Sequence, residues 1–141
     1  MTTIRRATFD DAASIGALLG ELGYPAEADE VARRLRGLDK SDNSVLVAVG
    51  DAGVVAGVAA LHRMAVLHSG LPVGYITAFV ITEHVRGRGV GKLLLSAAEQ
   101  WARDAGCGKI TVTSAEQRDG ARKFYPACGL PYTGRRYSKS L

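Results

Sequence analysis

The residues best suited to chemistry are a short run of alternating glycines and cations, Arg86-Gly87-Arg88-Gly89-Val90-Gly91-Lys92. Glycines let an anion approach the backbone closely, and the first N–H groups of a helix lack partners within that helix. The helix dipole adds partial positive charge at the same end. Because three cationic side chains stand in the same run, it predicts a binding site for a polyphosphate.

The spacing of this run excludes two familiar phosphate loops. A P-loop ending at Gly91-Lys92 needs glycine where Arg86 stands, and serine or threonine where Leu93 stands. The dinucleotide fingerprint fails because its third glycine comes one residue early, at Gly91, and no acidic residue follows at the expected distance. A tight glycine-rich turn without a ligand is the alternative that these residues leave open.

The segments on either side of the glycine run predict its local structure. Tyr75–Ile81 is rich in β-branched and aromatic residues and predicts a strand. From Val90 to Ala105, apolar residues recur at helical spacing. The glycine run is therefore expected to be a strand-to-helix turn that opens a long helix.

The remaining patterns predict alternating strands and helices around this turn. Asp10 is expected to cap the first helix, Gly50–Gly53 to form a hairpin turn, and Pro126 to shorten or kink the last helix before Gly129 ends it. Strands are expected over 3–8, 44–49, 54–63, 73–82 and 109–114, with a final strand or tight pair of strands over 132–138. Further helices are expected over 10–22 and 26–38, with Val31, Leu35 and Leu38 inward, and in a short segment that carries Ala121, Phe124 and Tyr125.

A known family shares the pattern Arg/Gln-x-x-Gly-x-Gly/Ala between a strand and a helix. Arg86–Gly91 matches it fully and resembles the acetyl-CoA pyrophosphate loop of the GNAT superfamily of N-acetyltransferases. The order of elements and the segment around Phe124-Tyr125 extend the resemblance over nearly all 141 residues. It implies an α/β fold, GNAT-like, with a mixed, mostly antiparallel central sheet flanked by helices on both faces. A single N-acetyltransferase domain over residues 2–141 is expected.

The resemblance also assigns a site for acetyl-CoA. The strand before the loop is expected to carry a bulge, to splay from its neighbour, and to bind the thioester carbonyl and pantetheine through backbone N–H groups. Arg118 replaces a common asparagine and would contact a phosphate or stay exposed, and small Ala121 would leave room for the CoA chain. The implied CoA-binding residues are Phe79, Val80, Ile81, Arg86, Gly87, Arg88, Gly89, Val90, Gly91, Lys92, Arg118 and Ala121.

Catalytic roles follow from the same resemblance. Tyr125 is the expected general acid, because a phenol can protonate the departing thiolate; a core tyrosine with a satisfied hydroxyl is the alternative. The carboxylate that many members carry before the loop is missing, since Thr77 and Ala78 stand there. Water-mediated deprotonation is therefore expected, with Glu116 and Glu83 as weaker candidates for the base.

Composition and charge narrow the classes of function. Residues 1–60 hold nine acidic and six basic residues, and residues 61–141 hold five acidic and twelve basic residues. A basic second half suits CoA, and no nucleic-acid motif accompanies it, so no nucleic-acid partner is expected. No apolar stretch approaches a membrane span and no signal-peptide core is present, so we expect a cytoplasmic protein without a membrane partner. Two cysteines are too few for a metal site, and no metal is expected.

The acceptor is left open by the sequence. Acidic residues from Glu21 to Glu30 would attract a cationic amine, whereas His62, Arg63, His68, Arg135 and Arg136 would recognise an anionic acceptor. A small-molecule amine is favoured, with a protein lysine or N-terminus as the alternative. A catalytically silent CoA-binding or sensor domain is the competing class of function. A homodimer is an expectation that rests on the resemblance alone.

Overall fold

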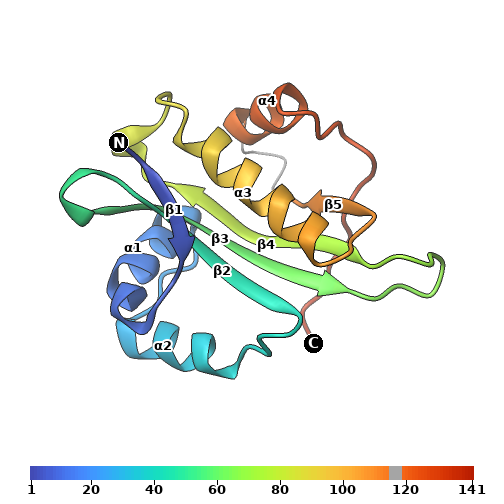
Figure 1. Cartoon of the computed structure of the whole chain (residues 1–141), viewed down its shortest axis with the longest axis horizontal. Coiled ribbons are helices and arrows are strands. Elements are labelled where there is room, and N and C mark those ends of the chain that lie inside the picture. Colours follow the sequence, from blue (N-terminus) through green and yellow to red (C-terminus); the bar gives the residue numbers. More distant parts are fainter. Residues whose placement is uncertain (115–118) are drawn as a thin grey trace.

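The computed structural model describes residues 1–114 and 119–141, which form a five-stranded sheet with helices on both faces (Figure 1). The strands are β1 (Thr3–Arg6), β2 (Asn43–Val49), β3 (Val55–Met64), β4 (Val73–Ile81) and β5 (Lys109–Val112). The α-helices are α1 (Ala12–Leu22), α2 (Ala28–Gly37), α3 (Val90–Asp104) and α4 (Asp119–Ala127). Short 3-10 turns are η1 (Phe9–Asp11), η2 (Asp51–Gly53) and η3 (Glu83–Val85). No helix in the described ranges combines the length and apolar character that crossing a membrane requires.

The sheet is mixed and mostly antiparallel, as the resemblance to the GNAT superfamily implied. Its strands lie in the order β1-β2-β3-β4-β5, and each neighbouring pair from β1 to β4 is antiparallel. β5 pairs with β4 in parallel, which a crossover through α3 makes sterically feasible. The glycine run therefore lies on the connection between the two parallel strands.

Two apolar layers hold the helices against the sheet. Alternate residues of a strand face opposite sides, so Val47, Val58 and Val80 pack under α1 and α2. Leu46, Ala48 and Ala59 face the other side, where α3 contributes a group of buried residues. Those helical residues are Val90, Leu94, Leu95 and Ala98. Val90, Leu94 and Ala98 belong to the helical pattern visible in the sequence, whereas Leu93 of the same pattern is 49% exposed and Leu95 is buried in its place. α3 is fixed to the sheet along this face.

One extra residue interrupts the pairing of β3 with β4. Ala60 pairs with Ala78 and Leu61 pairs with Ile76, so Thr77 has no partner in the register and forms a β-bulge. The bulge changes which residues face α3, because Ile76 before it and Phe79 and Ile81 after it all belong to the same apolar layer. It marks the point at which β4 also leaves β5.

The N-terminus of the first helix differs from the expected cap. Asp10 is exposed, and the turn is closed by Asp11, whose carboxylate accepts the Thr8 N–H at 2.7 Å. Arg5 donates two further hydrogen bonds to Asp11, at 2.8 and 2.9 Å. These bonds, opposed by burial and supported by the Thr8 N–H, hold the pKa of the Asp11 carboxyl below its ordinary value.

Two other expectations are wrong. Leu38 lies just beyond α2 and is 38% exposed, whereas Val31 is buried as expected. Residues 131–141 form no strand and are exposed. The segment contains Pro131 and Gly134 and no aliphatic residue before Leu141, so it has no apolar face to bury against β5. Pro126 does fall in the last turn of α4, and the helix ends one residue later.

Candidate active site at the β4–β5 splay

The glycine run forms an open turn at the start of α3. Gly87 and Gly89 have φ of +82° and +81°, values that residues with a Cβ rarely adopt. Gly89 is the N-cap of α3, and a Cβ built at either glycine would meet no atom within 4 Å. The N–H groups of the first helical turn therefore border open space, which is the geometry that an anion needs at a helix N-terminus.

Gly91 serves packing between helices. A Cβ at this position would lie 3.1 Å from Cε1 of Phe124 on α4, so only glycine lets the Phe124 ring rest on the first turn of α3. The third glycine of the run therefore fixes where α4 sits. This reason for a glycine was not visible in the sequence, because 33 positions separate the two residues.

The side chain of Arg86 is turned toward the protein. Its Nε donates to the Ile81 carbonyl at 2.9 Å, and its Nη2 lies 3.7 Å from Oε1 of Glu21 on α1. The same Glu21 oxygen accepts the Glu83 N–H at 3.0 Å. Arg86 thus ties the glycine run to the end of β4 and to α1, although 56% of its side chain is exposed. Arg88 and Lys92 are also exposed beside the turn.

Glu21 is a site residue whose role the sequence did not reveal. Partial burial acts to raise the pKa of its carboxyl, but the Glu83 N–H, the Thr82 hydroxyl, Arg86 and His84 together lower it below the ordinary value. An ionised Glu21 therefore bridges α1 and the segment that leads into the glycine run. Sequence reasoning placed Glu21 only in an acidic rim, since its partners are about 60 residues away.

β4 and β5 separate beyond the bulge. Their pairing ends at Ile76 with Val112, so the later residues of β4 have no β5 neighbour. The Thr82 N–H bonds to Ala56 of β3. Because direction alternates along an antiparallel strand, the N–H of Val80 also points toward β3, whereas those of Phe79 and Ile81 point into the splay.

An aromatic cluster links this splay to α4. The Phe79 and Phe124 ring centroids are 5.9 Å apart, and the Tyr125 ring lies 6.1 Å from Phe79 and 5.3 Å from Phe124. Edge contacts of this kind fix ring orientation. Tyr125 is half-buried, and Ala121 lies one helical turn before it. The structure therefore brings Phe79, Ala121 and Tyr125 together at the splay.

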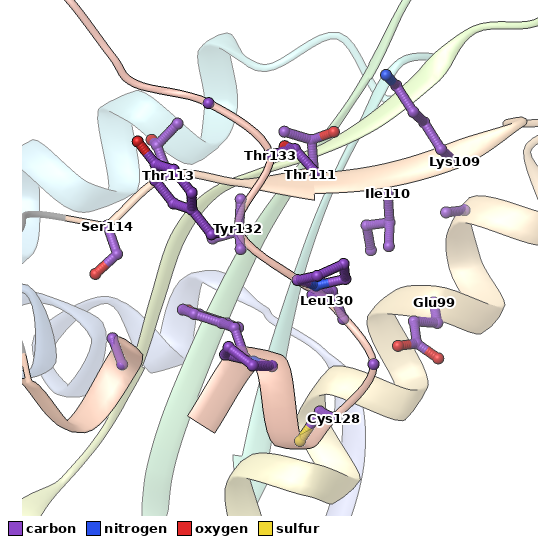
Figure 2. Close-up of a pocket in the computed structure, with 18 of the residues that line it drawn as sticks. Glu99, Lys109, Ile110, Thr111, Thr113, Ser114, Cys128, Leu130, Tyr132 and Thr133 are labelled. Atoms are coloured by element: carbon purple, nitrogen blue, oxygen red, sulfur yellow. The ribbon is translucent and has the colours of Figure 1, made fainter. Parts of the chain in front are cut away.

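A large cavity adjoins the splay along β5. Its volume is about 1560 Å³, and it is bordered by β5, the second half of α3, α4 and the segment 128–136 (Figure 2). Tyr24 from the turn between α1 and α2 also lines it. Of the expected site residues in the described ranges, Ala121 and Tyr125 line this cavity, and the glycine run does not. The site thus has two parts, which meet at Tyr125.

Of the two candidates for a general base, Glu83 is in the part of the chain that the structure describes and Glu116 is not. Glu83 is exposed on η3, and its backbone N–H is bonded to Glu21. Glu116 and Arg118 lie outside the described residues. Thr77 is exposed at the bulge and donates its hydroxyl to the Ala60 carbonyl at 3.3 Å. Within residues 1–114 and 119–141, no group of three His, Cys, Asp or Glu side chains is arranged to hold a metal ion.

Comparisons with known proteins agree with this geometry. The model of the Acetyltransferase (GNAT) family matches residues 13–130. The chain is 32% identical over 143 residues to the aminoalkylphosphonate N-acetyltransferase of Salmonella typhimurium, covering 98% of this chain and 90% of that one. It is 32% identical over 137 residues to the aminoglycoside N(6')-acetyltransferase type 1 of Stenotrophomonas maltophilia, covering 94% and 88%. A solved acetyltransferase of Trypanosoma brucei matches with a TM-score of 0.85, at 26% identity and over 100% of both chains. The chain therefore belongs to the GNAT family of acetyltransferases.

Proposed function

We propose that residues 2–141 form one N-acetyltransferase domain, which moves the acetyl group of acetyl-CoA to the primary amine of a small molecule in the cytoplasm. The observation that carries the proposal is the meeting of three features at one place: the open glycine turn, the β4–β5 splay, and Tyr125. Both curated relatives are named for small amine-bearing acceptors, an aminoalkylphosphonate and an aminoglycoside. What these acceptors share is the amine.

The groups suited to binding acetyl-CoA come from two elements, the glycine turn at the start of α3 and strand β4. The N–H groups at the start of α3, with the Arg88 and Lys92 side chains beside them, are suited to the pyrophosphate. The N–H groups of Phe79 and Ile81 point into the splay and are suited to the pantetheine and the thioester carbonyl. A fixed hydrogen-bond donor aimed at a developing oxyanion lowers the activation free energy by about 3 kcal/mol. Arg86 supports the acetyl-CoA site indirectly, through its hydrogen bond to the Ile81 carbonyl and its ion pair with Glu21.

The reaction we propose is direct attack in a ternary complex. The neutral amine nitrogen attacks the thioester carbonyl carbon, and the C–N bond forms as the oxyanion develops. The tetrahedral intermediate then collapses, the C–S bond breaks, and the CoA thiolate takes a proton from the Tyr125 hydroxyl. Water accepts the proton that the amine loses, because Thr77 and Ala78 supply no carboxylate, and the Tyr125 phenolate regains a proton from water to complete the turnover. Glu116 and Glu83 stay as candidate bases, and Arg118 as a candidate phosphate contact.

Initial rates of CoA thiol release test this proposal. Acetyl-CoA and the amine are varied together, over a panel of small primary amines and one lysine-bearing peptide. We expect turnover with small amines and intersecting reciprocal plots, which indicate a ternary complex. Parallel plots would point to an acetyl-enzyme instead. Tight CoA binding without turnover of any amine would favour a sensor domain, and turnover of the peptide alone would favour a protein acceptor.

A further inference from the structure

Three polar side chains meet at the mouth of the splay. The Tyr75 hydroxyl donates to Oγ1 of Thr113 at 3.3 Å, and Nη1 of Arg136 donates to the same oxygen at 3.2 Å. We refer to Tyr75, Thr113 and Arg136 as the Thr113 cluster. Its members come from β4, from the residue just beyond β5, and from the C-terminal segment, so three distant parts of the chain converge there.

The cluster has hydrogen-bond donors left over. Oγ1 of Thr113 accepts two bonds, which leaves the hydroxyl hydrogen of Thr113 available to donate. A guanidinium carries five N–H groups, and one of those of Arg136 is used on Thr113. Thr113 and Tyr75 are half-buried and Arg136 is exposed, so the Arg136 guanidinium is accessible to a ligand from solvent. A positive, donor-rich site of this kind suits an oxyanion.

The cluster also lies at the end of the β4–β5 pairing, where the splay begins. Tyr75 pairs with Thr111 in the parallel register, so Thr111 and Thr113 lie on the same face of the sheet as Tyr75. This face is opposite α3, since Ile110 and Val112 belong to the layer under that helix. Figure 2 shows Tyr132 and Thr133 of the C-terminal segment passing beside Thr111 and Thr113. Thr113 follows the last paired residue of β5, and the splay begins there.

Charge in the adjoining cavity is predominantly positive. Among the described residues that line it, the basic ones are Arg103, Lys109, Arg122, Arg135 and Arg136, and the acidic one is Glu99. Glu99 lies 3.8 Å from Arg103 on the same helix, so its charge is balanced locally. The space beside Tyr125 therefore carries a net positive lining.

Two of the acidic residues that could attract a cationic acceptor, Glu21 and Glu30, form ion pairs away from the cavity. Glu21 bridges Glu83 and Arg86, and Glu30 lies 3.2 Å from Arg34 on α2. Neither Glu21 nor Glu30 lines the cavity, to which the turn between α1 and α2 contributes Tyr24.

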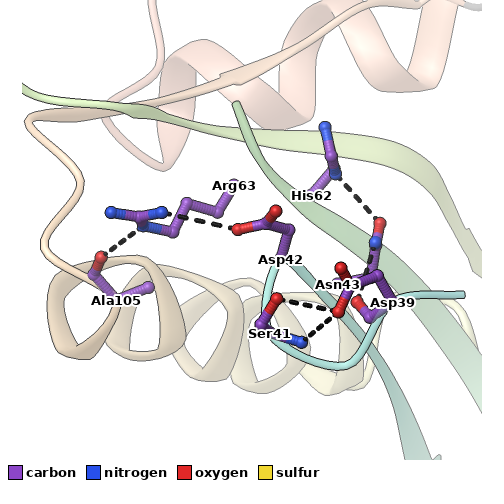
Figure 3. A network of polar contacts seen from close by, with 7 residues as sticks. All are labelled: Asp39, Ser41, Asp42, Asn43, His62, Arg63 and Ala105. Atoms are coloured by element: carbon purple, nitrogen blue, oxygen red, sulfur yellow. Dashed lines mark hydrogen bonds and ion pairs between the residues drawn. The ribbon is translucent and has the colours of Figure 1, made fainter. Parts of the chain in front are cut away.

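Two of the other cationic candidates are held in a separate network. His62 bonds to Asn43 at 3.0 Å, and Arg63 donates to the Ala105 carbonyl at 2.9 Å and lies 3.4 Å from Asp42 (Figure 3). Neither His62 nor Arg63 lines the cavity. Of the cationic candidates from the sequence, Arg135 and Arg136 are the ones that line the same cavity as Tyr125.

We infer that the acceptor is a short amine that also carries an oxyanion, bound by the Thr113 cluster while its amine points into the splay. The inference rests on the proposed function, since it names the class of acceptor for the same site. Phosphonate, phosphate and carboxylate groups share the required chemistry, and a plain amine or a polycationic amine lacks it. Arg136 is the specificity-determining residue of this cluster.

Matched acceptors test the inference directly. The rate of acetyl transfer is measured with 2-aminoethylphosphonate and 3-aminopropanoate, and with ethanolamine and propylamine as partners without an anion. We expect kcat/KM to be about tenfold or more higher for the anionic amines, from charge-assisted bonds to the guanidinium. The larger effect with the phosphonate or with the carboxylate identifies the preferred oxyanion. Equal kcat/KM for anionic and plain amines would overturn the inference and leave the proposed function intact.

Variants of Arg136 connect the preference to this residue. Arg136→Gln should lower kcat/KM for the anionic amines about tenfold or more, mainly through KM, and leave propylamine within about twofold. Arg136→Lys should recover part of the loss, and Lys139→Gln in the same exposed segment is the matched control. An equal loss with propylamine, or a parallel loss of acetyl-CoA affinity, would contradict the assignment.

Calorimetry gives a readout that does not depend on turnover. The CoA-bound protein is titrated with 2-aminoethylphosphonate, and we expect binding that Arg136→Gln weakens about tenfold or more. Binding that is absent, or unchanged in Arg136→Gln, would overturn the inference even in a protein that turns over no amine. Binding of 2-aminoethylphosphonate that Arg136→Gln weakens, without turnover of any amine, would contradict the proposed function and support the Thr113 cluster as an oxyanion site.

Discussion

At the scale of single residues, the side chains of the candidate site are held in place by neighbouring groups. Tyr125 is held by ring contacts with Phe79 and Phe124, so its hydroxyl is directed by packing on two sides. Arg86 and Glu21 are bonded to backbone groups around the glycine turn. The groups that we propose to carry the chemistry, Tyr125 and the backbone N–H groups of the splay, therefore have positions set by their neighbours.

Replacing Tyr125 by phenylalanine removes the hydroxyl group and keeps the ring, so it tests proton donation separately from packing. The ring contacts with Phe79 and Phe124 are kept, so we expect an unchanged melting temperature and unchanged acetyl-CoA affinity. The rate should fall about a hundredfold or more, which is the range for a lost general acid. Tyr137→Phe, at an 86% exposed tyrosine, is the control for the loss of a hydroxyl. A Tyr125→Phe enzyme with the rate of the original chain would remove the general-acid role.

Asp11 gives a pH dependence with a defined sign. Its pKa is lower in the folded protein than its ordinary value of about 3.9, so the stability it contributes is complete well above that value. It is lost as the pH falls through the folded pKa. Asp11→Asn should lower the free energy of unfolding by about 1–2 kcal/mol at pH 7, because the two charge-assisted hydrogen bonds from Arg5 to the carboxylate are lost or weakened.

The difference should shrink in acid. Urea unfolding of both proteins at pH 7 and at pH 3 measures it, and Asp10→Asn, at an exposed neighbour, is the control. A constant difference at the two pH values would show that ionisation of Asp11 does not stabilise the fold.

At the scale of elements, one extra residue in β4 creates the site. The bulge at Thr77 turns Phe79 and Ile81 toward α3, and β5 stops pairing at Val112. The resulting gap exposes backbone donors that a regular parallel pair would use for its own ladder. Contacts from α1 and α4 then fix the two sides of the gap, through Glu21 and Phe124.

The contact between α3 and α4 can be tested at Gly91. Gly91→Ala places a methyl group 3.1 Å from Phe124 Cε1, so we expect the Phe124 ring to be displaced by a few tenths of an ångström and to disturb the neighbouring Tyr125. We expect a net loss of about 1–2 kcal/mol in stability, since overpacking exceeds the gain in helix propensity. The rate should also fall. Gly37→Ala, where a Cβ meets no atom within 4 Å, should instead be neutral or stabilising. Equal behaviour of the two variants in thermal unfolding would contradict this reason for the glycine.

The bridge from α1 to the glycine turn can be tested at Glu21. Glu21→Ala removes the acceptor of the Glu83 N–H and the partner of Arg86, so the turn should lose its order. We expect acetyl-CoA affinity to fall about tenfold, with a smaller loss in Glu21→Gln, which keeps one acceptor oxygen. Glu30→Ala, on the surface of α2, controls for the loss of a negative charge. Calorimetric titration with acetyl-CoA that shows equal affinity in Glu21→Ala would contradict the bridge.

At the scale of the whole molecule, the sequence predicted the sheet, the helices and the glycine turn, because periodicity and glycine spacing are local signals. It did not predict the contacts of Glu21 or the reason for Gly91, since both join residues that are distant in the chain. The final strand was wrong because residues 132–138 lack an apolar face. The cavity and the Thr113 cluster could not be predicted either, since they depend on where this exposed segment crosses β5.

The most direct test of the account follows the acetyl group itself. Acetyl-CoA labelled with carbon-13 at the thioester carbonyl is mixed with excess protein and a small primary amine, and carbon-13 NMR records a single turnover. The account predicts that the thioester signal is replaced by an amide signal on the small molecule, with no labelled protein as an intermediate. A label that stays on the thioester, or that accumulates on the protein, would contradict direct transfer to a small amine.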